Sequence, residues 1–426
     1  MPAIASVGCR LRSTIRPLVL LIFLASACEC GNLGGVGLFA AEYVIHISVD
    51  GLNASLMQQS IDDGTAPNFK RLQDEGAWTT NARADYTHTN TLPNHTCMFT
   101  GRPTLQPAGM PEMLYHGWTT NKVPKLGASL HNRNDPHIGY VASVFDVVHD
   151  AGLSTALYAS KDKFILYDQS YDENNGATHA HGRDKIDLFY YANDGPPRFS
   201  ATMHARFMSD MAERRFNYVF LHYRDTDTTG HALGWGSGGW FYALRNVDGY
   251  LGQILQLVDK DETLAGRTAI IVCTDHGGTG FGHDEFLIPG NYTIPILVWG
   301  AGVEHGKLYA MNRATRTDPG EARPDYTESS QPIRNGDTGN LALSLLGHDP
   351  IPGSVINAKQ DLRVSQSVVG DYNSDGTVDA ADYIVWRSTQ GSTTDLRADG
   401  NRDGRVDAAD HDLWKANLGQ SAAAAH

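Results

Sequence analysis

The stretch YVIHISVDG, from Tyr43 to Gly51, decides the fold of this chain. It is an apolar, β-branched run that ends in Asp-Gly. Such a run is typical of a central strand that is buried on both faces of a sheet. Ligands of open α/β sheets bind at the carboxyl ends of the strands, so Asp50 stands where a functional carboxylate is expected.

Further strand-like runs alternate with helical patterns along the chain. STALYAS, NYVFLHY and RTAIIVCTD read as strands, and TAPNFKRLQDEG reads as a short helix that begins at Pro67 and ends at Gly76. YVASVFDVVHDAG, WFYALRNVDGYLGQILQLV and TGNLALSLLGHDPIPG are helical, and residues 313–337 read as loop. The order predicts an α/β fold with a mostly parallel central sheet and helices on both faces.

Composition limits the class of protein. The 426 residues are 41% hydrophobic, which is enough for one large core and a small module. The formal charge of -14 excludes a binder of the nucleic-acid backbone, so we expect no duplex partner. Cys97 and Cys273 lie in apolar segments and are expected to be buried thiols, without a disulfide framework.

The N-terminus resembles an export signal. The apolar run PLVLLIFLASA follows three arginines and is too short to span a bilayer comfortably. We expect residues 1–41 to be a signal peptide and a mature N-terminal lead, with a periplasmic, extracellular or cell-surface location and no stable membrane span after signal removal. Alternatives are lipidation at Cys28 in LASAC, cleavage near LFAAEY, and an uncleaved membrane anchor.

Two acidic repeats near the C-terminus have the pattern of calcium loops. DYNSDGTVDAADYIVW begins at Asp371 and DGNRDGRVDAADHDLW begins at Asp399, with a period of 28 residues. Oxygen side chains at loop positions 1, 3, 5, 9 and 12, with glycine at position 6, suit a hard cation. Thr377 and Arg405 contribute carbonyl oxygens only. The expected side-chain ligands of two calcium ions are Asp371, Asn373, Asp375, Asp379, Asp382, Asp399, Asn401, Asp403, Asp407 and Asp410.

This duplicated loop resembles a type I dockerin module over Gly370 to Gly419, although position 12 is aspartate rather than the glutamate of a standard EF-hand. The resemblance implies a small α-helical module that folds with calcium and docks to a cohesin-like protein. The alternative is a flexible acidic tail. The expected division is a catalytic domain over 42–360, a linker over 361–369, the module over 370–420 and a tail over 421–426.

The larger domain carries scattered aspartates and histidines at strand ends. Asp50 ends the first strand, DTTGH supplies Asp227 and His231, TDHGG supplies Asp275 and His276, and GFGHDEF supplies His283. A mixture of carboxylate and imidazole ligands suits zinc, and less often manganese or iron. It does not suit a pure magnesium or calcium site.

Together with TNTLPNHTCMFTG, from Thr89 to Gly101, these motifs resemble the alkaline phosphatase superfamily. The resemblance is to its nucleotide pyrophosphatase/phosphodiesterase branch and covers Tyr43 to Gly353. It implies two zinc ions, one held by Asp50, Thr91, Asp275 and His276, the other by Asp227, His231 and His283. His305 in GVEHGK is the main alternative to His283. Sulfatase chemistry is disfavoured, because TLPNH lacks the Cys/Ser-x-Pro-x-Arg context.

Thr91 is the expected nucleophile of a phosphate-ester hydrolase. A bound divalent cation would lower the pKa of its hydroxyl, and a phospho-threonine would form and then be hydrolysed. We expect backbone amides at the start of a helix to meet the phosphate. Asn121 in HGWTTN would donate its amide to a phosphoryl oxygen. Without metals Thr91 would read as a helix cap, and Asn121 as a turn residue.

The substrate stays open at this stage. Phosphodiesters or pyrophosphates follow from the branch, whereas Lys161 and Lys163 in ASKDKF resemble lysine pairs of phosphomonoesterases and phosphonoacetate hydrolases of the same superfamily. Two ammonium groups favour a dianionic phosphate or a second carboxylate. A solvated lysine pair is the plain alternative, and a group-transfer mutase is a weaker option. The alternative of another class is a degenerate, dockerin-bearing binding protein.

Overall fold

The computed structural model describes most of the chain, in two compact units. The described residues are 7–11, 41–106, 108–109, 114–131, 138–313, 315–365, 368–373, 377–393, 395–401 and 403–420. Among these residues, the larger unit comprises 7–9 and those from 41 to 365, and the smaller one comprises 10–11 and those from 368 to 420. The expected signal segment apart from 7–11, Asp375, part of the linker and the tail 421–426 lie outside the described residues.

A sheet of nine strands forms the centre of the larger unit. Its order is β1-β5-β4-β6-β2-β7-β8-β3-β9. β5, β4, β6, β2 and β7 are parallel to one another, β8 runs antiparallel to both of its neighbours, and β9 is parallel to β3. The strands are β1 (Val7–Leu11), β2 (Tyr43–Val49), β3 (Ala77–Arg83), β4 (Thr155–Ala159), β5 (Leu188–Ala192), β6 (Tyr218–Tyr223), β7 (Thr268–Cys273), β8 (Thr293–Gly300) and β9 (Gly306–Lys307). The mostly parallel sheet predicted from the sequence is confirmed.

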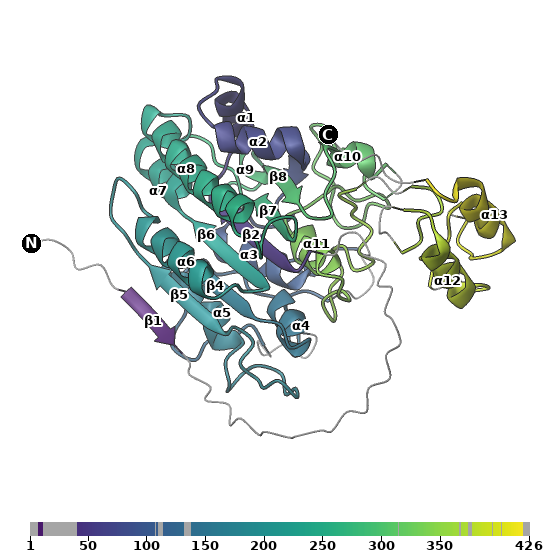
Figure 1. Ribbon diagram of the computed structural model, residues 1–426. Coiled ribbons are helices and arrows are strands. Elements are labelled where there is room, and N and C mark those ends of the chain that lie inside the picture. The colour runs from purple at the N-terminus through teal and green to yellow at the C-terminus, as the bar shows by residue number, and fades with distance from the viewer. Residues whose placement is uncertain are drawn as a thin grey trace, which may run out of the picture. The chain divides into compact units, whose positions relative to one another are not determined.

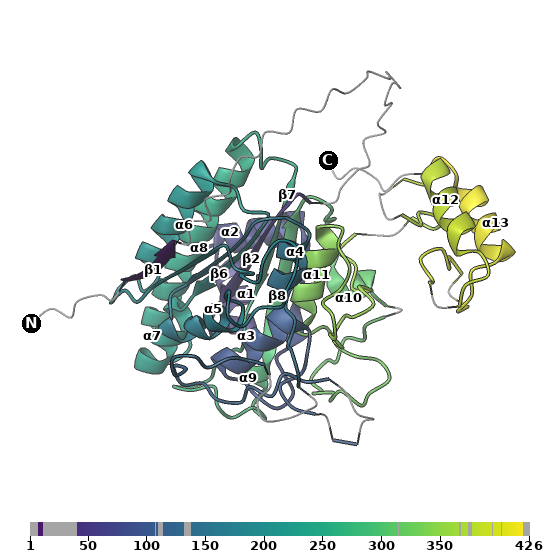
Figure 2. The same cartoon turned by 90° about the horizontal axis from the view of Figure 1, so that it is seen from below.

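Helices cover both faces of this sheet (Figures 1 and 2). One face packs against α1 (Ala54–Asp62), α2 (Pro67–Glu75), α6 (Ala201–Glu213) and α8 (Gly238–Lys260). The other packs against α3 (Thr91–Thr100), α4 (Val144–Asp150), α5 (Ile165–Ser170) and α11 (Asp337–Leu345). Short elements complete the unit: η1 (Asp162–Phe164), α7 (Asp225–Leu233), α9 (Pro289–Tyr292) and α10 (Leu308–Met311).

The apolar run Tyr43–Val49 forms β2, in the middle of the sheet, where both of its faces are covered. All residues of β2 after Tyr43 are buried, with Val44 in one core and Ile45 and Ile47 in the other. Its polar members, His46 and Ser48, are buried too, and Nδ1 of His46 lies 3.0 Å from the Tyr218 hydroxyl. A strand of this kind needs neighbours on both edges and helices on both faces, as the sequence predicted.

The parallel arrangement brings several loops to one edge of the sheet. β2, β4, β6 and β7 point the same way, so the residues that follow them meet at their carboxyl ends. Asp50 follows β2, Lys161 follows β4, Asp227 lies in α7 after β6, and Asp275 follows β7. Because β8 is antiparallel to β7, the loop after β8 leaves from the opposite edge. The exposed His305 lies on that loop.

The smaller unit is a two-helix module with an internal repeat. α12 (Ala380–Thr389) and α13 (Ala408–Asn417) each begin with an aspartate capping box. Trp386 Nε1 donates to the Asp407 carbonyl at 2.8 Å, and Trp414 Nε1 donates to the Asp379 carbonyl at 2.7 Å. Each repeat therefore anchors the other in the same way.

Candidate active site

Asp50, Asp275 and His276 form one group of possible metal ligands. All three are fully buried, and one ligand atom from each lies within 4.8 Å of the others. His276 Nε2 lies 3.1 Å from Asp275 Oδ2 and 3.6 Å from Asp50 Oδ1. These are three of the four side chains expected at the first metal position.

Asp227, His231 and His283 form a second group beside the first. Asp227 Oδ1 lies 3.4 Å from Nε2 of each histidine, and the two Nε2 atoms are 3.1 Å apart. His276 stacks on His283 with ring centroids 3.5 Å apart, and it can also join Asp227 and His283 around one ion. His231 lies on the outer side, with its side chain 44% exposed. The structure thus brings His283, and not His305, to this edge.

Orphaned buried atoms show that the two groups fit cations. Asp50 Oδ1, Asp227 Oδ1, Asp275 Oδ2 and His276 Nε2 are buried without a hydrogen bond in the described part of the chain. A buried polar atom without a partner is costly, so four of them at one place indicate an ion-binding site. Nδ1 of His276 faces the Gly277 carbonyl at 2.8 Å, and Nδ1 of His283 faces the Thr89 carbonyl at 2.5 Å. A carbonyl only accepts, so a neutral ring presents its Nε2 lone pair to the site.

Lys161 joins the two groups. Its Nζ donates to Asp50 Oδ2 at 2.6 Å and to Asp227 Oδ2 at 2.7 Å, and it lies 3.5 Å from Thr91 Oγ1. Burial lowers the pKa of Lys161, but the nearby carboxylates outweigh burial and raise the pKa above its ordinary value. The ammonium therefore stays charged beside the proposed nucleophile.

The carboxylates and imidazoles of the site influence one another. Burial raises the pKa of Asp227, but the charge of Lys161 and contacts with His231 and His283 hold it well below its usual range. Burial lowers the pKa of His276, but Asp275, Asp50 and Asp227 raise it to about 9. The pKa of His283 is lowered by burial and by the charge of His276. The cluster is charged and buried, as metal sites are.

Thr91 is the first residue of α3 and is buried. The Leu92 amide donates to Asn121 Oδ1 at 3.1 Å, and Pro93 has no N–H, so neither of these two residues offers a free amide to a phosphate. Lys163 Nζ also donates to Asn121 Oδ1, at 3.1 Å. Because two donors hold that oxygen, the amide group of Asn121 is left to donate elsewhere.

Sequence reasoning missed the buried residues that orient these ligands. His222 Nε2 contacts Asp50 Oδ2 at 2.8 Å, which directs Asp50 Oδ1 toward the proposed ion. His95 connects Ser48 Oγ, at 2.8 Å, with the Thr91 carbonyl, at 2.7 Å. The available signal was a polar residue inside an otherwise apolar strand, as at His222 in NYVFLHY.

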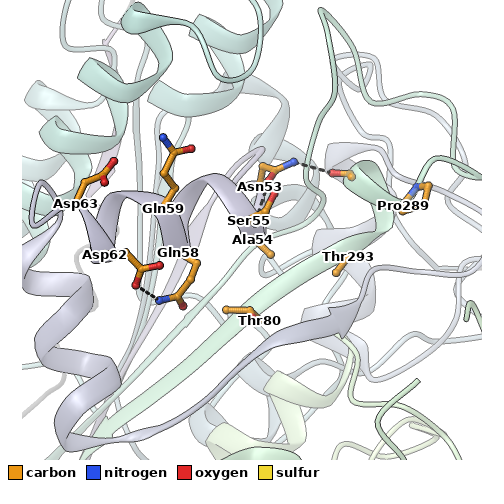
Figure 3. A pocket seen from close by; sticks show the side chains of 11 residues that line it. Asn53, Ala54, Ser55, Gln58, Gln59, Asp62, Asp63, Thr80, Pro289 and Thr293 are labelled. Atoms are coloured by element: carbon orange, nitrogen blue, oxygen red, sulfur yellow. Dashed lines mark hydrogen bonds between the residues drawn. The ribbon is translucent and has the colours of Figure 1, made fainter. Parts of the chain in front are cut away.

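A separate hollow of about 680 Å³ lies along α1 and contains none of the expected ligands. Figure 3 shows Gln58, Gln59 and Asp62 on the helix side, with Thr80, Pro289 and Thr293 across from them. Asn53 at one end donates to the carbonyl of Gly278, on the loop that carries His276 and His283, and to the carbonyl of Gly290 in α9. We assign the chemistry to the carboxylate and imidazole cluster, because the orphaned atoms lie there.

The calcium loops are described in part. In the second loop, the Asp403 amide donates to Asp399 Oδ1 at 3.1 Å and to Asn401 Oδ1 at 3.0 Å. At position 12, Asp382 and Asp410 are fully buried, and each accepts backbone amides from its own loop. Asp371, Asn373, Asp379 and Asp407 lie on these loops, where Thr377 and Arg405 hold the carbonyl positions. This oxygen-rich set suits calcium.

Cys97 and Cys273 are buried free thiols, and burial raises the pKa of both. Among the helices that the structure describes, none has the length and apolar character needed to cross a membrane.

The fold and the site define an α/β protein with a mostly parallel sheet and a cluster of buried carboxylates and imidazoles at the carboxyl ends of its strands. One solved structure with this fold is a 2-O GAG sulfatase, with a TM-score of 0.51, 10% identity, and coverage of 77% of this chain and 75% of the other. A murine ectonucleotide pyrophosphatase/phosphodiesterase 5 is also similar, with a TM-score of 0.47, 13% identity, and coverage of 75% of this chain and 99% of the other.

The chain belongs to the type I phosphodiesterase / nucleotide pyrophosphatase family, whose profile matches residues 44–336. Membership supports a phosphoric ester hydrolase. The dockerin type I domain profile matches residues 369–419, which confirms the resemblance of the smaller unit.

Curated relatives match over a limited part of the chain. GPI ethanolamine phosphate transferase 1 of Neurospora crassa is 33% identical over 111 residues, which is 26% of this chain and 10% of the relative. The Homo sapiens protein of the same name is 26% identical over 140 residues, which is 33% of this chain and 15% of the relative. The chain thus matches a tenth to about a seventh of the length of these relatives.

Proposed function

We propose that this protein is an exported two-metal hydrolase that cleaves phosphodiester or pyrophosphate bonds through Thr91. The observation that carries the proposal is the group of four orphaned, buried ligand atoms at the carboxyl edge of the sheet, beside Thr91. Two zinc ions suit the donors Asp50, Asp275 and His276, and Asp227, His231 and His283. Manganese or iron is the alternative metal.

The residues of the chain divide the work of the reaction. The carboxylates and imidazoles of the two groups would hold divalent cations, whose Lewis acidity would lower the pKa of the Thr91 hydroxyl and offset charge on the phosphoryl group. Thr91 Oγ forms a bond to phosphorus while the bond to the leaving alcohol breaks, and the threonine proton ends on that alcohol. One water then cleaves the phospho-threonine and restores the hydroxyl. Asn121 donates its amide to a phosphoryl oxygen, and Lys161 holds a positive charge near the reacting oxygen.

A second candidate is a phosphomonoesterase or a phosphonoacetate hydrolase-like enzyme. The observation that favours it is the position of Lys161 and Lys163, whose ammonium groups contact Asp50, Asp227 and Asn121. A dianionic phosphate gains more from two cations than a monoanionic diester does. A degenerate binding protein is disfavoured, because the ligand set expected of the family is complete.

The smaller unit gives the enzyme a means of attachment. The dockerin domain implies a cohesin-like partner, and its acidic loops would fold around two calcium ions. An exported enzyme held in this way acts on substrates outside the cytoplasm. The location and the partner are part of our proposal.

The experiment that tests the function compares substrates and metals on the purified full chain. The zinc-loaded protein is assayed with a bis-nitrophenyl phosphate diester, a nitrophenyl monoester and a dinucleotide pyrophosphate. We expect turnover of the diester or the pyrophosphate to exceed that of the monoester, to disappear on chelation and to return with zinc. Turnover that persists without metal, or none with any ester, would overturn the proposal.

A further inference from the structure

A second cluster of imidazoles lies at the opposite edge of the sheet, where the parallel strands begin. β4 and β5 are parallel neighbours, so the segments that lead into them meet at this amino-terminal edge, away from the candidate active site. One segment is the end of α4, and the other is the loop between α5 and β5. Thr155 Oγ1 donates to the Lys185 carbonyl at 2.7 Å, which joins the two segments. Together they carry His149, Asp150, His179 and His181.

Asp150 lies between two of these histidines as Asp227 does in the candidate active site. Asp150 Oδ1 is 3.4 Å from Nδ1 of His149 and 3.4 Å from Nδ1 of His179. Asp227 Oδ1 is also 3.4 Å from the nearest nitrogen of each of its two histidines. Both places therefore present one carboxylate oxygen and two imidazole nitrogens at the separations expected of ligands that share an ion.

His181 brings a third imidazole to the cluster. Its ring stacks on that of His179, with centroids 5.6 Å apart, and meets the ring of His149 edge-on, with centroids 6.5 Å apart. A Cβ at Gly152 would lie 3.2 Å from His181 Cε1, so glycine allows this ring to approach the end of α4. The His181 amide donates to Nδ1 of His179 at 3.4 Å, so that nitrogen carries a lone pair, as a metal ligand must.

A buried lysine orients the carboxylate of the cluster. Lys185 Nζ donates to Asp150 Oδ1 at 2.6 Å and to the Gly182 carbonyl at 2.8 Å, and its side chain is fully buried. A carboxylate has about four lone-pair positions, so this bond leaves others for an ion. Lys161 contacts Asp227 in a similar way, at 2.7 Å. A lysine beside the ligand carboxylate is thus common to both places.

A network of ion pairs explains this arrangement poorly. Asp150 is already paired with Lys185, so protonated His149 and His179 would place two more positive charges beside one carboxylate. Like charges so close together repel one another. Neutral imidazoles avoid this repulsion, and their lone pairs are what a transition-metal ion binds.

We propose that His149, His179 and His181, together with Asp150, bind one zinc ion at the amino-terminal edge of the sheet. Three imidazoles and one carboxylate supply the four nitrogen and oxygen donors of a closed zinc site. The ion would fasten the loop before β5 to the end of α4. This inference does not depend on the proposed function, because none of the four residues belongs to the candidate active site.

The test counts the zinc bound to the purified full chain by equilibrium dialysis and elemental analysis, with excess calcium to keep the C-terminal loops filled. We expect the wild-type protein to bind one zinc ion more than the double variant His179→Ala, His181→Ala. The single variant His179→Ala should raise the Kd of that ion at least about tenfold. The matched control is His305→Ala, because His305 is exposed on the loop after β8 and should leave the zinc content unchanged.

A variant without the catalytic ligands separates this site from the proposed function. Asp50→Asn, Asp227→Asn should lose the zinc of the candidate active site and keep the zinc at the opposite edge, until His179→Ala and His181→Ala are added. Diester turnover of the otherwise wild-type protein should stay within about twofold when only the two histidines are replaced, because the sites are far apart.

Equal zinc content in the wild type and the double histidine variant would overturn the inference. Equal zinc loss in His305→Ala would overturn it too, since the binding would then not be specific to the cluster. If no protein hydrolyses the diester while the double histidine variant still lacks one zinc, the proposed hydrolase fails and this site stands.

Discussion

Lys161 Nζ lies 2.6 Å from Asp50 Oδ2, and the same ammonium reaches the other ligand group through Asp227. A single cation thus links the two halves of the candidate metal site. His222 contacts the same oxygen of Asp50, so the other oxygen remains for an ion. Lys161 therefore adds positive charge to the site, and His222 fixes which oxygen of Asp50 faces the ion, although neither residue belongs to a metal-binding motif.

Replacing both lysines tests whether they recognise substrate charge. We expect Lys161→Ala, Lys163→Ala to lower kcat/KM for a monoester about 100-fold and for a diester about tenfold or less, because a dianion loses more than a monoanion. Lys70→Ala, an exposed lysine on α2, is the control. Equal losses on both esters, or no loss, would contradict a role in charge recognition.

Thr91→Ala should lower turnover of every ester about 1,000-fold or more, because it removes the attacking oxygen. Zinc content should stay largely the same, since the carboxylates and imidazoles remain, and Thr91→Ser should recover part of the rate. Kinetics and elemental analysis of the three proteins check this. Mass spectrometry of acid-quenched wild-type enzyme should find phosphate on Thr91. Full activity of the alanine variant would exclude the covalent route.

His222→Ala should weaken zinc binding about 10- to 100-fold, because Asp50 loses the contact that orients it. The ring is buried, so the substitution also leaves a cavity. His204→Ala is a matched control, since His204 is similarly buried and contacts the Tyr223 hydroxyl away from the ligands. Zinc competition titrations of both variants separate the two effects. Equal zinc affinity in the two variants would show that His222 only fills space.

The zinc-free protein should lose stability as pH rises through about 9. The pKa of His276 is raised to about 9 in the folded protein, above its ordinary value of 6.5. Protonated His276 therefore stabilises the fold fully below pH 6.5, and the contribution, at most about 3 kcal/mol, is lost as pH rises through the folded pKa. Zinc affinity should increase over the same range, since the metal displaces this proton.

Urea unfolding followed by circular dichroism checks this pH dependence, with zinc removed by a selective chelator and calcium kept. His276→Asn should flatten the profile between pH 6.5 and 9. A flat profile for the wild-type protein would show that His276 does not titrate there.

Much of the fold could be predicted because the decisive segments carry strong local patterns. β2, β4, β6 and β7 are apolar runs, and Pro67 and Gly76 mark α2 as expected. β8 was missed because TIPILVWG contains Pro295, which is unusual inside a sheet. The structure accommodates it where the register of β3 against β8 shifts, between the pairs Thr79–Ile296 and Ala82–Ile294.

The site residues likewise fall into those that a local sequence motif predicts and those that no motif predicts. Candidate ligands such as Asp227 and Asp275 could be identified from the local motifs DTTGH and TDHGG, and the structure brings the residues of these motifs together at one edge of the sheet. His222 and His95 have no motif, because their roles depend on which strands become neighbours. His222 lies opposite Ser48 in the register of β6 and β2, and Ser48 contacts His95. These contacts can be predicted only when the order of the strands in the sheet is known.

The reciprocal tryptophans of the dockerin unit predict that its two calcium loops are coupled. Trp386 donates to the carbonyl of Asp407, and Trp414 donates to the carbonyl of Asp379, so each indole anchors position 9 of the other loop. Trp386→Phe removes one donor and should cost about 1 kcal/mol in the calcium-loaded state. We expect it to weaken calcium binding at the second loop more than at the first, and Trp414→Phe to do the reverse. The control is Trp299→Phe, because the Trp299 indole contacts Glu75 in the larger unit.

Calcium titration of proteins in which one loop is disabled, by Asp371→Ala or Asp399→Ala, resolves the two sites. An effect confined to the loop of the substituted repeat would show that the indole bonds only complete the core and do not couple the loops.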